Sequence, residues 1–382
     1  MKLSEKIGSI EKSGTIEFVP LIEKLEIQGK DIINFAVGEP DFETPDNIIE
    51  ATKKALDENK TRYSDVSGII ELRKAVSERL SREHNLMYNE ENVMISNGSK
   101  HALYNAFHAI CNPHDEVIIP RPYWVSFAEQ VKLVDAKPIF TDTIGHQLDI
   151  EKIKKSISNK TKAIIINSPN NPTGAVYKKD DLKAITDLAL DNNFYIVSDE
   201  TYESMIYDGI KHFSAGSLSE EVKDITLTIK SFSKEFSMTG FRVGYVAAEK
   251  NIIDTMNNLQ GHVTGNVCTF SQYGALAALS IDKSIIKKRV SILEKRRDMA
   301  YKLTKKLFDC IKPEGAFYLF PNVESALGSI KSSEELASYF IEKAGVAVVP
   351  GEVFGVKNHI RISYALPEEE IKKGFEKISK LL

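Results

Sequence analysis

Short β-branched and aliphatic runs alternate with amphipathic stretches through the middle of the chain. Six such runs stand at residues 93–95, 116–119, 163–166, 195–197, 226–229 and 243–246. Between the first two, apolar residues of the segment 102–110 recur at a spacing of three and four, which places them on one helical face. Apolar runs that alternate with helices predict a mainly parallel α/β sheet with helices packed on it.

The pattern changes after about residue 280, where the sequence predicts a charged amphipathic helix from Ile285 to Phe308. Apolar runs follow at 316–320 and 346–349, and the segment 360–364 has the alternation of a strand. Together these elements predict a smaller α+β domain.

The apolar run 32–37 near the start of the chain is also strand-like, and we expect it to join the smaller domain or to bridge the two domains. The predicted division is an N-terminal segment 1–45 that joins the small domain, a large domain 46–280 and a small C-terminal domain 281–382.

Composition and charge narrow the classes of function. The chain has 382 residues, enough to bury a large core, and a net charge of −4, which leaves no basic excess for nucleic acid or an anionic membrane. Its three cysteines form no C-x-x-C pair, which argues against a disulfide framework or a cysteine metal site. No apolar run approaches the roughly 18 residues that span a bilayer. We therefore expect a cytoplasmic protein without nucleic-acid, membrane or metal partners.

Polar side chains follow four of the predicted strands, directly after each apolar run. These clusters are 97–100, 167–174, 199–202 and 231–234. Because ligands bind beyond the carboxyl ends of the strands in an open parallel sheet, we expect the four clusters to meet at one crevice.

One of these clusters, and an arginine eight residues after Lys234, suit an anion. Gly98-Ser99 at a helix start would offer free N–H groups and the positive end of the helix dipole to a phosphate. The same pair also fits a turn glycine before a serine N-cap. Arg242 suits bidentate phosphate binding, with a surface ion pair as the alternative. Neither G-x-G-x-x-G nor G-x-x-x-x-G-K-[ST] occurs, so dinucleotide and P-loop sites lack support.

Lys234 stands between a predicted buried strand and the turn 237–240. Desolvation or a neighbouring cation there would lower the pKa of its amine and free it for Schiff-base chemistry, whereas a solvated lysine is the ordinary alternative. Asp199 and Tyr202 would share a face of a helical turn. Taken singly, they also fit a helix cap and a core aromatic.

Several motifs, taken in order, resemble those of the class I and II pyridoxal-phosphate-dependent aminotransferases. They are Asn171-Pro-Thr-Gly, Ser198-Asp-Glu-Thr-Tyr, the run from Ser231 to Tyr245 and Arg361-Ile-Ser-Tyr-Ala, with further matches at 38–42, 63, 122–126 and 349–351. The resemblance covers almost the whole chain, and the branch of bacterial and archaeal aspartate aminotransferases is the most similar. It implies fold type I: a large domain with a mostly parallel seven-stranded sheet flanked by helices, and a smaller α+β domain.

The resemblance identifies Lys234 as the residue that binds pyridoxal 5′-phosphate covalently and then moves a proton at the substrate Cα. It implies that Asp199 faces the pyridine nitrogen and keeps it protonated. Tyr202 and Asn171 would bond the ring 3-oxygen. Trp124 would stack on the ring and border the substrate, although the only tryptophan also suits a core.

For the cofactor phosphate, the resemblance implies contacts from the backbone of Gly98, Ser99 and Lys100, the Ser231 hydroxyl, the Arg242 guanidinium and Tyr63. Tyr63 would come from a second subunit, so the resemblance implies a homodimer with shared active sites.

For the substrate, the resemblance implies that Arg361 clamps the α-carboxylate through its planar fork, assisted by Asn171 and the Gly38 backbone. Lys100 matches a lysine that some relatives use for a distal carboxylate; the alternative is an exposed lysine in the first turn of a helix. Thr15 lies in a segment that often closes over the substrate. Gly265 replaces the serine of the Thr-Ser-Asn found in many relatives.

The implied activity is amino transfer between an L-amino acid and a 2-oxo acid by a ping-pong mechanism. The predicted pairs are aspartate or glutamate with 2-oxoglutarate or oxaloacetate, and aromatic or other neutral amino acids stay open. A carbon–sulfur β-lyase is the enzymatic alternative, because one cofactor site supports several reactions. A regulator with an aminotransferase-like sensor would need a DNA-binding extension of about 70 residues, whereas the match begins near residue 10.

Overall fold

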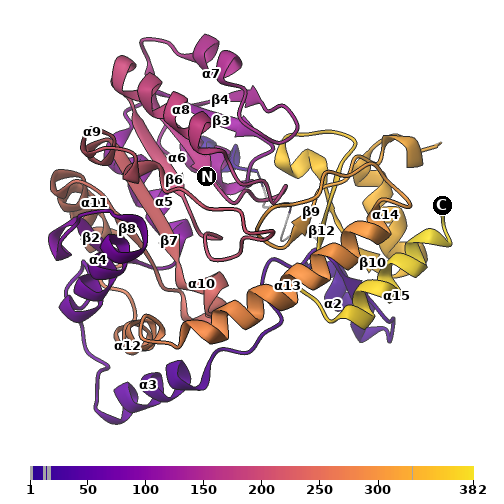
Figure 1. Cartoon of the computed structure of the whole chain (residues 1–382), viewed down its shortest axis with the longest axis horizontal. Helices are drawn as coiled ribbons and strands as arrows, with labels where there is room; N and C mark the ends of the chain where they lie inside the picture. Colours follow the sequence, from indigo (N-terminus) through magenta and orange to yellow (C-terminus); the bar gives the residue numbers. More distant parts are fainter. Residues whose placement is uncertain (1–2, 12–13, 15–18, 329) are drawn as a thin grey trace.

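The computed structural model describes residues 3–11, 14, 19–328 and 330–382. Two lobes are joined by the long helix α13 (Lys283–Thr304), which runs from the larger lobe to the smaller one (Figure 1). Thr15 lies outside the described residues. The domain boundaries near residues 45 and 280 stay predictions.

The larger lobe is built on a seven-stranded sheet in the order β2-β8-β7-β6-β5-β3-β4. Its strands are β2 (Val93–Ser96), β3 (Glu116–Arg121), β4 (Lys137–Asp142), β5 (Thr161–Asn167), β6 (Tyr195–Asp199), β7 (Thr226–Ser231) and β8 (Gly244–Ala247). Only β8 runs against the others, pairing antiparallel with β2 and β7. The predicted α/β class and mostly parallel sheet are confirmed.

Helices cover both faces of this sheet because the side chains of each strand alternate between them. On β5, Ile165 packs into the core beneath α5 and α6, whereas Ile164 and Ile166 pack on the other side against α8. The helices of this lobe are α3 (Asp46–Asp57), α4 (Ile70–His84), α5 (Ser99–Ile110), α6 (Ser126–Leu133), α7 (Ile150–Ser156), α8 (Lys179–Asn192), α9 (Glu220–Asp224), α10 (Phe232–Glu235), α11 (Lys250–Val263) and α12 (Thr269–Ala278).

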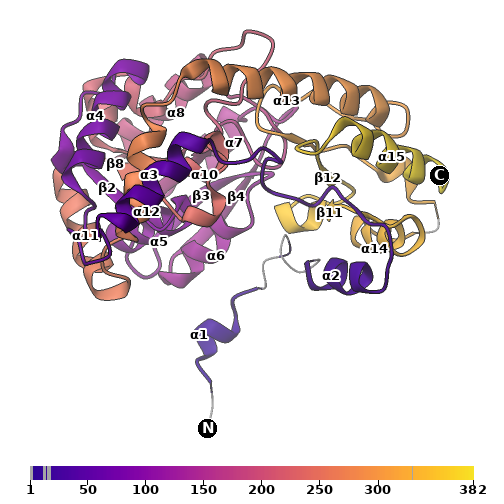
Figure 2. The same ribbon diagram turned by 90° about the horizontal axis from the view of Figure 1, so that it is seen from below.

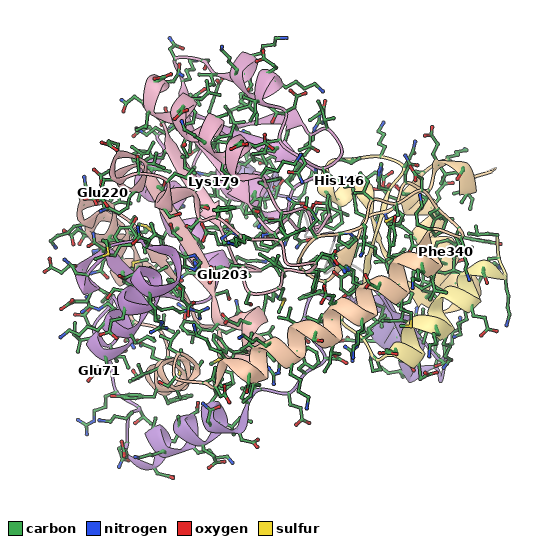
Figure 3. The ribbon with its side chains drawn as sticks, viewed as in Figure 1. Glu71, His146, Lys179, Glu203, Glu220 and Phe340 are labelled. Atoms are coloured by element: carbon green, nitrogen blue, oxygen red, sulfur yellow. The ribbon has the colours of Figure 1, made fainter. Side chains whose placement is uncertain are left out.

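The smaller lobe contains short strands and helices around its own core, in which Figure 3 shows Phe340. Its elements are β9 (Tyr318–Leu319), α14 (Ser333–Ala344), β10 (Val346–Ala347), β11 (Val349–Pro350), β12 (Ile360–Ser363) and α15 (Glu368–Ser379). Strand β12 pairs antiparallel with both β11 and β9. The strand predicted near residue 32 is β1 (Ile33–Asn34), which pairs with β10.

The N-terminal helices differ in their placement. Helix α2 (Val19–Ile27) packs Ile22 and Leu25 against the smaller lobe, whereas α1 (Glu5–Gly8) lies apart from α2 (Figure 2), and its Lys6 pairs with Asp135 of the larger lobe. Short 3₁₀ turns complete the fold at η1 (Glu90–Asn92), η2 (Ala215–Ser217), η3 (Thr239–Phe241), η4 (Glu324–Ala326) and η5 (Gly351–Phe354). Within the described ranges, no helix is long and apolar enough to cross a membrane. The cytoplasmic location stays a prediction.

Candidate active site

A cavity of about 580 Å³ opens at the carboxyl ends of the central strands. It is lined by Ile22, Asn34, Ala36, Val37, Gly38, Glu39, Ser99, Lys100, Trp124, Asn167, Asn171, Asp199, Thr201, Tyr202, Ser231, Ser233, Lys234, Thr239, Arg242, Tyr318 and Arg361. All four polar strand ends therefore contribute to one cavity, and the smaller lobe adds Tyr318 and Arg361.

Lys234 reaches this cavity from the short helix α10, directly after β7. Its Nζ donates to the backbone oxygen of Gly38 at 2.6 Å. Burial lowers the pKa of Lys234 to about 8; nearby Arg361, Arg242 and Lys100 act in the same direction, whereas Glu39 opposes them. Roughly a tenth of this amine is therefore neutral and nucleophilic at pH 7, far more than for an ordinary lysine.

Asp199 ends β6 and is almost completely buried. Burial raises the pKa of its carboxyl group to about 6, against hydrogen bonds from Thr201 that favour the anion. The Thr201 N–H donates to Asp199 Oδ1 at 3.1 Å, so the chain forms a turn here rather than the helical turn considered from the sequence. A cationic partner in the cavity would restore the charged form of Asp199.

Arg361 enters from β12 with its guanidinium buried. Nη1 donates to Asn171 Oδ1 at 3.1 Å and Nη2 donates to the Ala36 oxygen at 2.9 Å. Among the described residues, the buried Nε has no hydrogen-bond partner. Because unpaired buried donors are costly, this arrangement points to an anionic ligand.

Tyr202 and Tyr318 meet at the same wall of the cavity. Their hydroxyl oxygens lie 2.9 Å apart, and the Arg361 guanidinium stacks on the Tyr318 ring at 4.4 Å. Sequence reasoning missed Tyr318, which stood only as part of an apolar run. It also missed Thr201 and Glu39, whose neighbours it had singled out.

A second anion site lies where α5 begins. Gly98 has a φ of +77°, and an added Cβ would lie 2.7 Å from Arg242 Nη2, so glycine lets the guanidinium approach the turn. Gly98 is itself the N-cap residue, and the described chain supplies no side-chain cap, so the Ser99 N-cap alternative is wrong. The Ser231 oxygen accepts from the Ser233 N–H at 3.1 Å, which leaves the hydroxyl proton to donate.

Lys100 and Trp124 line the cavity together. Lys100 Nζ lies 5.1 Å from the centre of the Trp124 ring, a distance typical of a cation–π contact. Lys100 is exposed as a residue, but partial desolvation of its amine and nearby Arg242 lower its pKa. Trp124 is half-buried and packs edge-on against Phe127, so it borders the cavity as well as the core.

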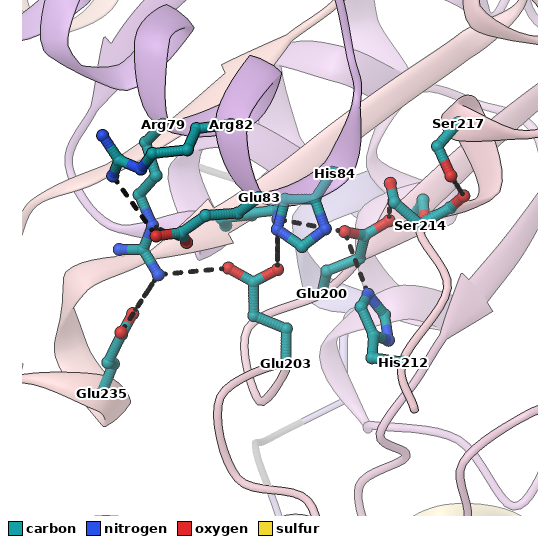
Figure 4. Close-up of polar contacts among 12 residues, drawn as sticks. Arg79, Arg82, Glu83, His84, Glu200, Glu203, His212, Ser214, Ser217 and Glu235 are labelled. Atoms are coloured by element: carbon teal, nitrogen blue, oxygen red, sulfur yellow. Dashed lines mark hydrogen bonds and ion pairs between the residues drawn. The ribbon is translucent and has the colours of Figure 1, made fainter. Parts of the chain in front are cut away.

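A network of ion pairs and hydrogen bonds holds the segment 199–203 in place through Glu200 and Glu203 (Figure 4). Lys230, with a side chain 3% exposed, pairs with Glu200 and Glu203, and its Nζ lies 2.8 Å from His84 Nε2. His84, Glu203 and His212 could together offer three ligand atoms to a metal, within 4.8 Å of one another. Lys230 Nζ already contacts two of these residues, Glu203 and His84, so the Lys230 ammonium supplies the positive charge in this cluster.

Two residues of the predicted site, Gly98 and Tyr63, do not line the cavity, and neither does Gly265. Gly98 shapes it through its turn, as described above. Tyr63 is 97% exposed and lies outside it. Gly265 has a φ of +69°, which disfavours a side chain, and open space surrounds the position of a Cβ.

Known proteins are similar to this chain over its full length. The family model for aminotransferase class I and II matches residues 30–378. The chain is similar to the probable aspartate/prephenate aminotransferase of Aquifex aeolicus, with 41% identity over 100% of this chain and 98% of the relative. It is 39% identical to the aspartate aminotransferase of Bacillus subtilis, over 100% and 99% of the two chains. Among solved structures, the aspartate aminotransferase from Thermus thermophilus with maleate has a TM-score of 0.95 at 37% identity, over 100% of both chains.

Proposed function

The chain belongs to the class I and II aminotransferases, whose cofactor is pyridoxal 5′-phosphate, and from this we propose that it exchanges amino groups between dicarboxylic partners. Aspartate or glutamate would be the donor, and 2-oxoglutarate or oxaloacetate the acceptor. The single observation that carries this proposal is a cavity with two separate cationic side chains for a substrate, Arg361 and Lys100.

The residues present fit the cofactor. The uncapped start of α5, the Arg242 guanidinium and the Ser231 hydroxyl form a cradle for its phosphate. Asp199 would pair with the protonated ring nitrogen, which supplies the cation that this buried carboxylate lacks. When bound, the cofactor provides an electron sink for the carbanion at the substrate Cα.

The chain's own residues then perform three tasks. Lys234 would hold the cofactor covalently through its amine and, once the amine is free, would take the proton from the substrate Cα and deliver it to the cofactor. Arg361 and Asn171 orient the α-carboxylate, so that the bond to be broken faces Lys234. Tyr202 would donate a hydrogen bond to the ring 3-oxygen.

Lys100 provides the argument for a second carboxylate. Its ammonium lies over Trp124 on the cavity wall, where a distal carboxylate of a substrate could reach it. The Thermus relative was solved with maleate, a dicarboxylate, which supports the same substrate class here.

A panel of amino donors and 2-oxo acid acceptors on purified protein tests this function. Each productive donor should convert the bound cofactor to its amine form and release the matching 2-oxo acid. Release of thiol and pyruvate from cysteine-type substrates, without that conversion, would instead establish the β-lyase alternative.

Lys100→Ser should weaken dicarboxylic substrates selectively. Because the charge pair is partly exposed, we expect kcat/KM for aspartate to fall by about 5- to 30-fold, or ~1–2 kcal/mol, and the loss to shrink as salt rises. Alanine, which has no second carboxylate, should barely change.

Lys179→Ser is the matched control, because Lys179 also lies over an aromatic ring, 5.4 Å from Phe213, and lies outside the cavity (Figure 3). It should leave both substrates unchanged. Equal losses for alanine and aspartate in Lys100→Ser would show that Lys100 only supports the phosphate turn.

We also propose a homodimer with shared active sites, in which Tyr63 acts in the partner's cavity. Its 97% exposure fits a side chain that is covered by a second copy. Sedimentation should give twice the chain mass. Mixing Lys234→Ala dimers with Tyr63→Ala dimers should yield hybrids with one intact site and recover activity; no recovery despite subunit exchange would refute sharing through Tyr63.

A further inference from the structure

Tyr318 connects two parts of the active site that the proposed mechanism treats separately. Its ring lies against the Arg361 guanidinium, and its hydroxyl contacts that of Tyr202. The side chain is 1% exposed, and its position is set by strand pairing: Tyr318 on β9 is the register partner of Ser363 on β12, two residues after Arg361. One strand therefore places both the arginine and the tyrosine.

Either hydroxyl can be the donor in this hydrogen bond, and a count of protons shows what remains for a third group. Burial raises the pKa of Tyr202 well above its ordinary value and also raises that of Tyr318, so both phenols are protonated at neutral pH. One of the two hydroxyl protons forms the hydrogen bond between the Tyr202 and Tyr318 oxygens. Within the described part of the chain, neither hydroxyl has another hydrogen-bond partner, so the second proton is available to a third oxygen in the cavity.

We propose that Tyr318 is a positioning residue that donates to the Tyr202 oxygen and thereby directs the Tyr202 proton to the cofactor 3-oxygen. The inference rests on the roles proposed above for Tyr202 and Lys234. A hydroxyl that accepts a hydrogen bond becomes a stronger donor. Stronger donation stabilises the anionic 3-oxygen, which lowers the pKa of the nitrogen that joins Lys234 to the cofactor.

The Arg361 contact adds a link to substrate binding. The positive guanidinium lies on the face of the Tyr318 ring, where it favours proton donation by the phenol. A substrate carboxylate would offset that charge. The hydrogen bond at the 3-oxygen would then respond to whether the carboxylate site is filled.

Tyr318→Phe tests the hydroxyl and keeps the ring. We expect the pKa of the visible absorbance of the bound cofactor to rise by about half a unit to one unit. Tyr318→Leu, which also removes the ring, should in addition raise KM for amino acids about tenfold, because Arg361 loses its stacking partner. Tyr364→Phe is the matched control: this buried tyrosine bonds the Ala316 backbone outside the cavity, and its loss should not move the absorbance pKa.

The decisive comparison repeats Tyr318→Phe in a Tyr202→Phe background. If Tyr318 acts through Tyr202, the second substitution should add no shift. An equal shift in both backgrounds, or no shift in either, would overturn the proposal. Borohydride labelling of Lys234 separates the two failures: an unlabelled Lys234 refutes the proposed function, whereas a labelled Lys234 with an unmoved pKa refutes only the role of Tyr318.

Discussion

Lys234→Ala should reduce amino transfer by at least about 10³-fold, because the substitution removes both the covalent anchor and the base that moves the Cα proton. Loss of only one role would leave a smaller defect. The phosphate cradle and Asp199 are untouched, so the variant should still bind the cofactor, though without the absorbance of a covalent link. The measurements are single-turnover rates and the absorbance of the loaded protein.

Borohydride reduction followed by peptide mapping locates the link directly. In the wild-type protein, the pyridoxyl group should be found on Lys234. Lys183→Ala provides the matched control, since Lys183 is an exposed lysine paired with Asp187 and its removal should change neither rate nor label. A label on any other lysine would remove the basis of the mechanism.

The same residue should set the pH dependence of cofactor capture. Only the neutral amine attacks the aldehyde, and the Lys234 pKa of about 8 makes roughly a tenth of it neutral at pH 7. The capture rate of cofactor-free protein should therefore rise with pH and level off above about 8. For an ordinary exposed lysine, the capture rate would continue to rise up to about pH 10.5.

Much of the fold was accessible from the sequence because buried parallel strands contain continuous apolar runs, as in residues 163–166 of β5. Strand β4 was missed for the corresponding reason. Of its residues only Thr141 is buried, so it shows neither a continuous run nor alternation. Strand β2 also lies at an edge of the sheet, but all four of its residues are buried, and its apolar run was recognisable.

The residues of the site also differed in whether the sequence alone could single them out. Lys234 and Asp199 could be singled out because each follows a recognisable strand within its own segment. Tyr318 could not, because its partner Tyr202 is 116 residues away and the contact depends on how β9 pairs with β12. Lys230 was likewise hidden, since its contact with His84 joins residues 146 apart in the chain.

Arg361→Leu should lower kcat/KM for amino acids by about 10²-fold or more, or ~3 kcal/mol, because a charge-assisted, two-point contact with the α-carboxylate is lost. Cofactor binding should persist, as measured by its absorbance, since Arg361 is separate from the phosphate cradle. The variant also leaves Asn171 Oδ1 and the Ala36 oxygen without their donor, so thermal melting must show that the fold survives.

Arg361→Lys distinguishes charge from geometry. It retains the positive charge in the buried position but loses the planar fork, so we expect it to recover only part of the lost kcat/KM. Amines that lack an α-carboxylate give the sharpest readout. They have nothing for the guanidinium to bind, so Arg361→Lys and Arg361→Leu should change their slow reaction far less than that of aspartate. If such amines lose as much activity as aspartate does, Arg361 supports the architecture of the cavity through Asn171 and Tyr318, and the carboxylate clamp must be sought elsewhere.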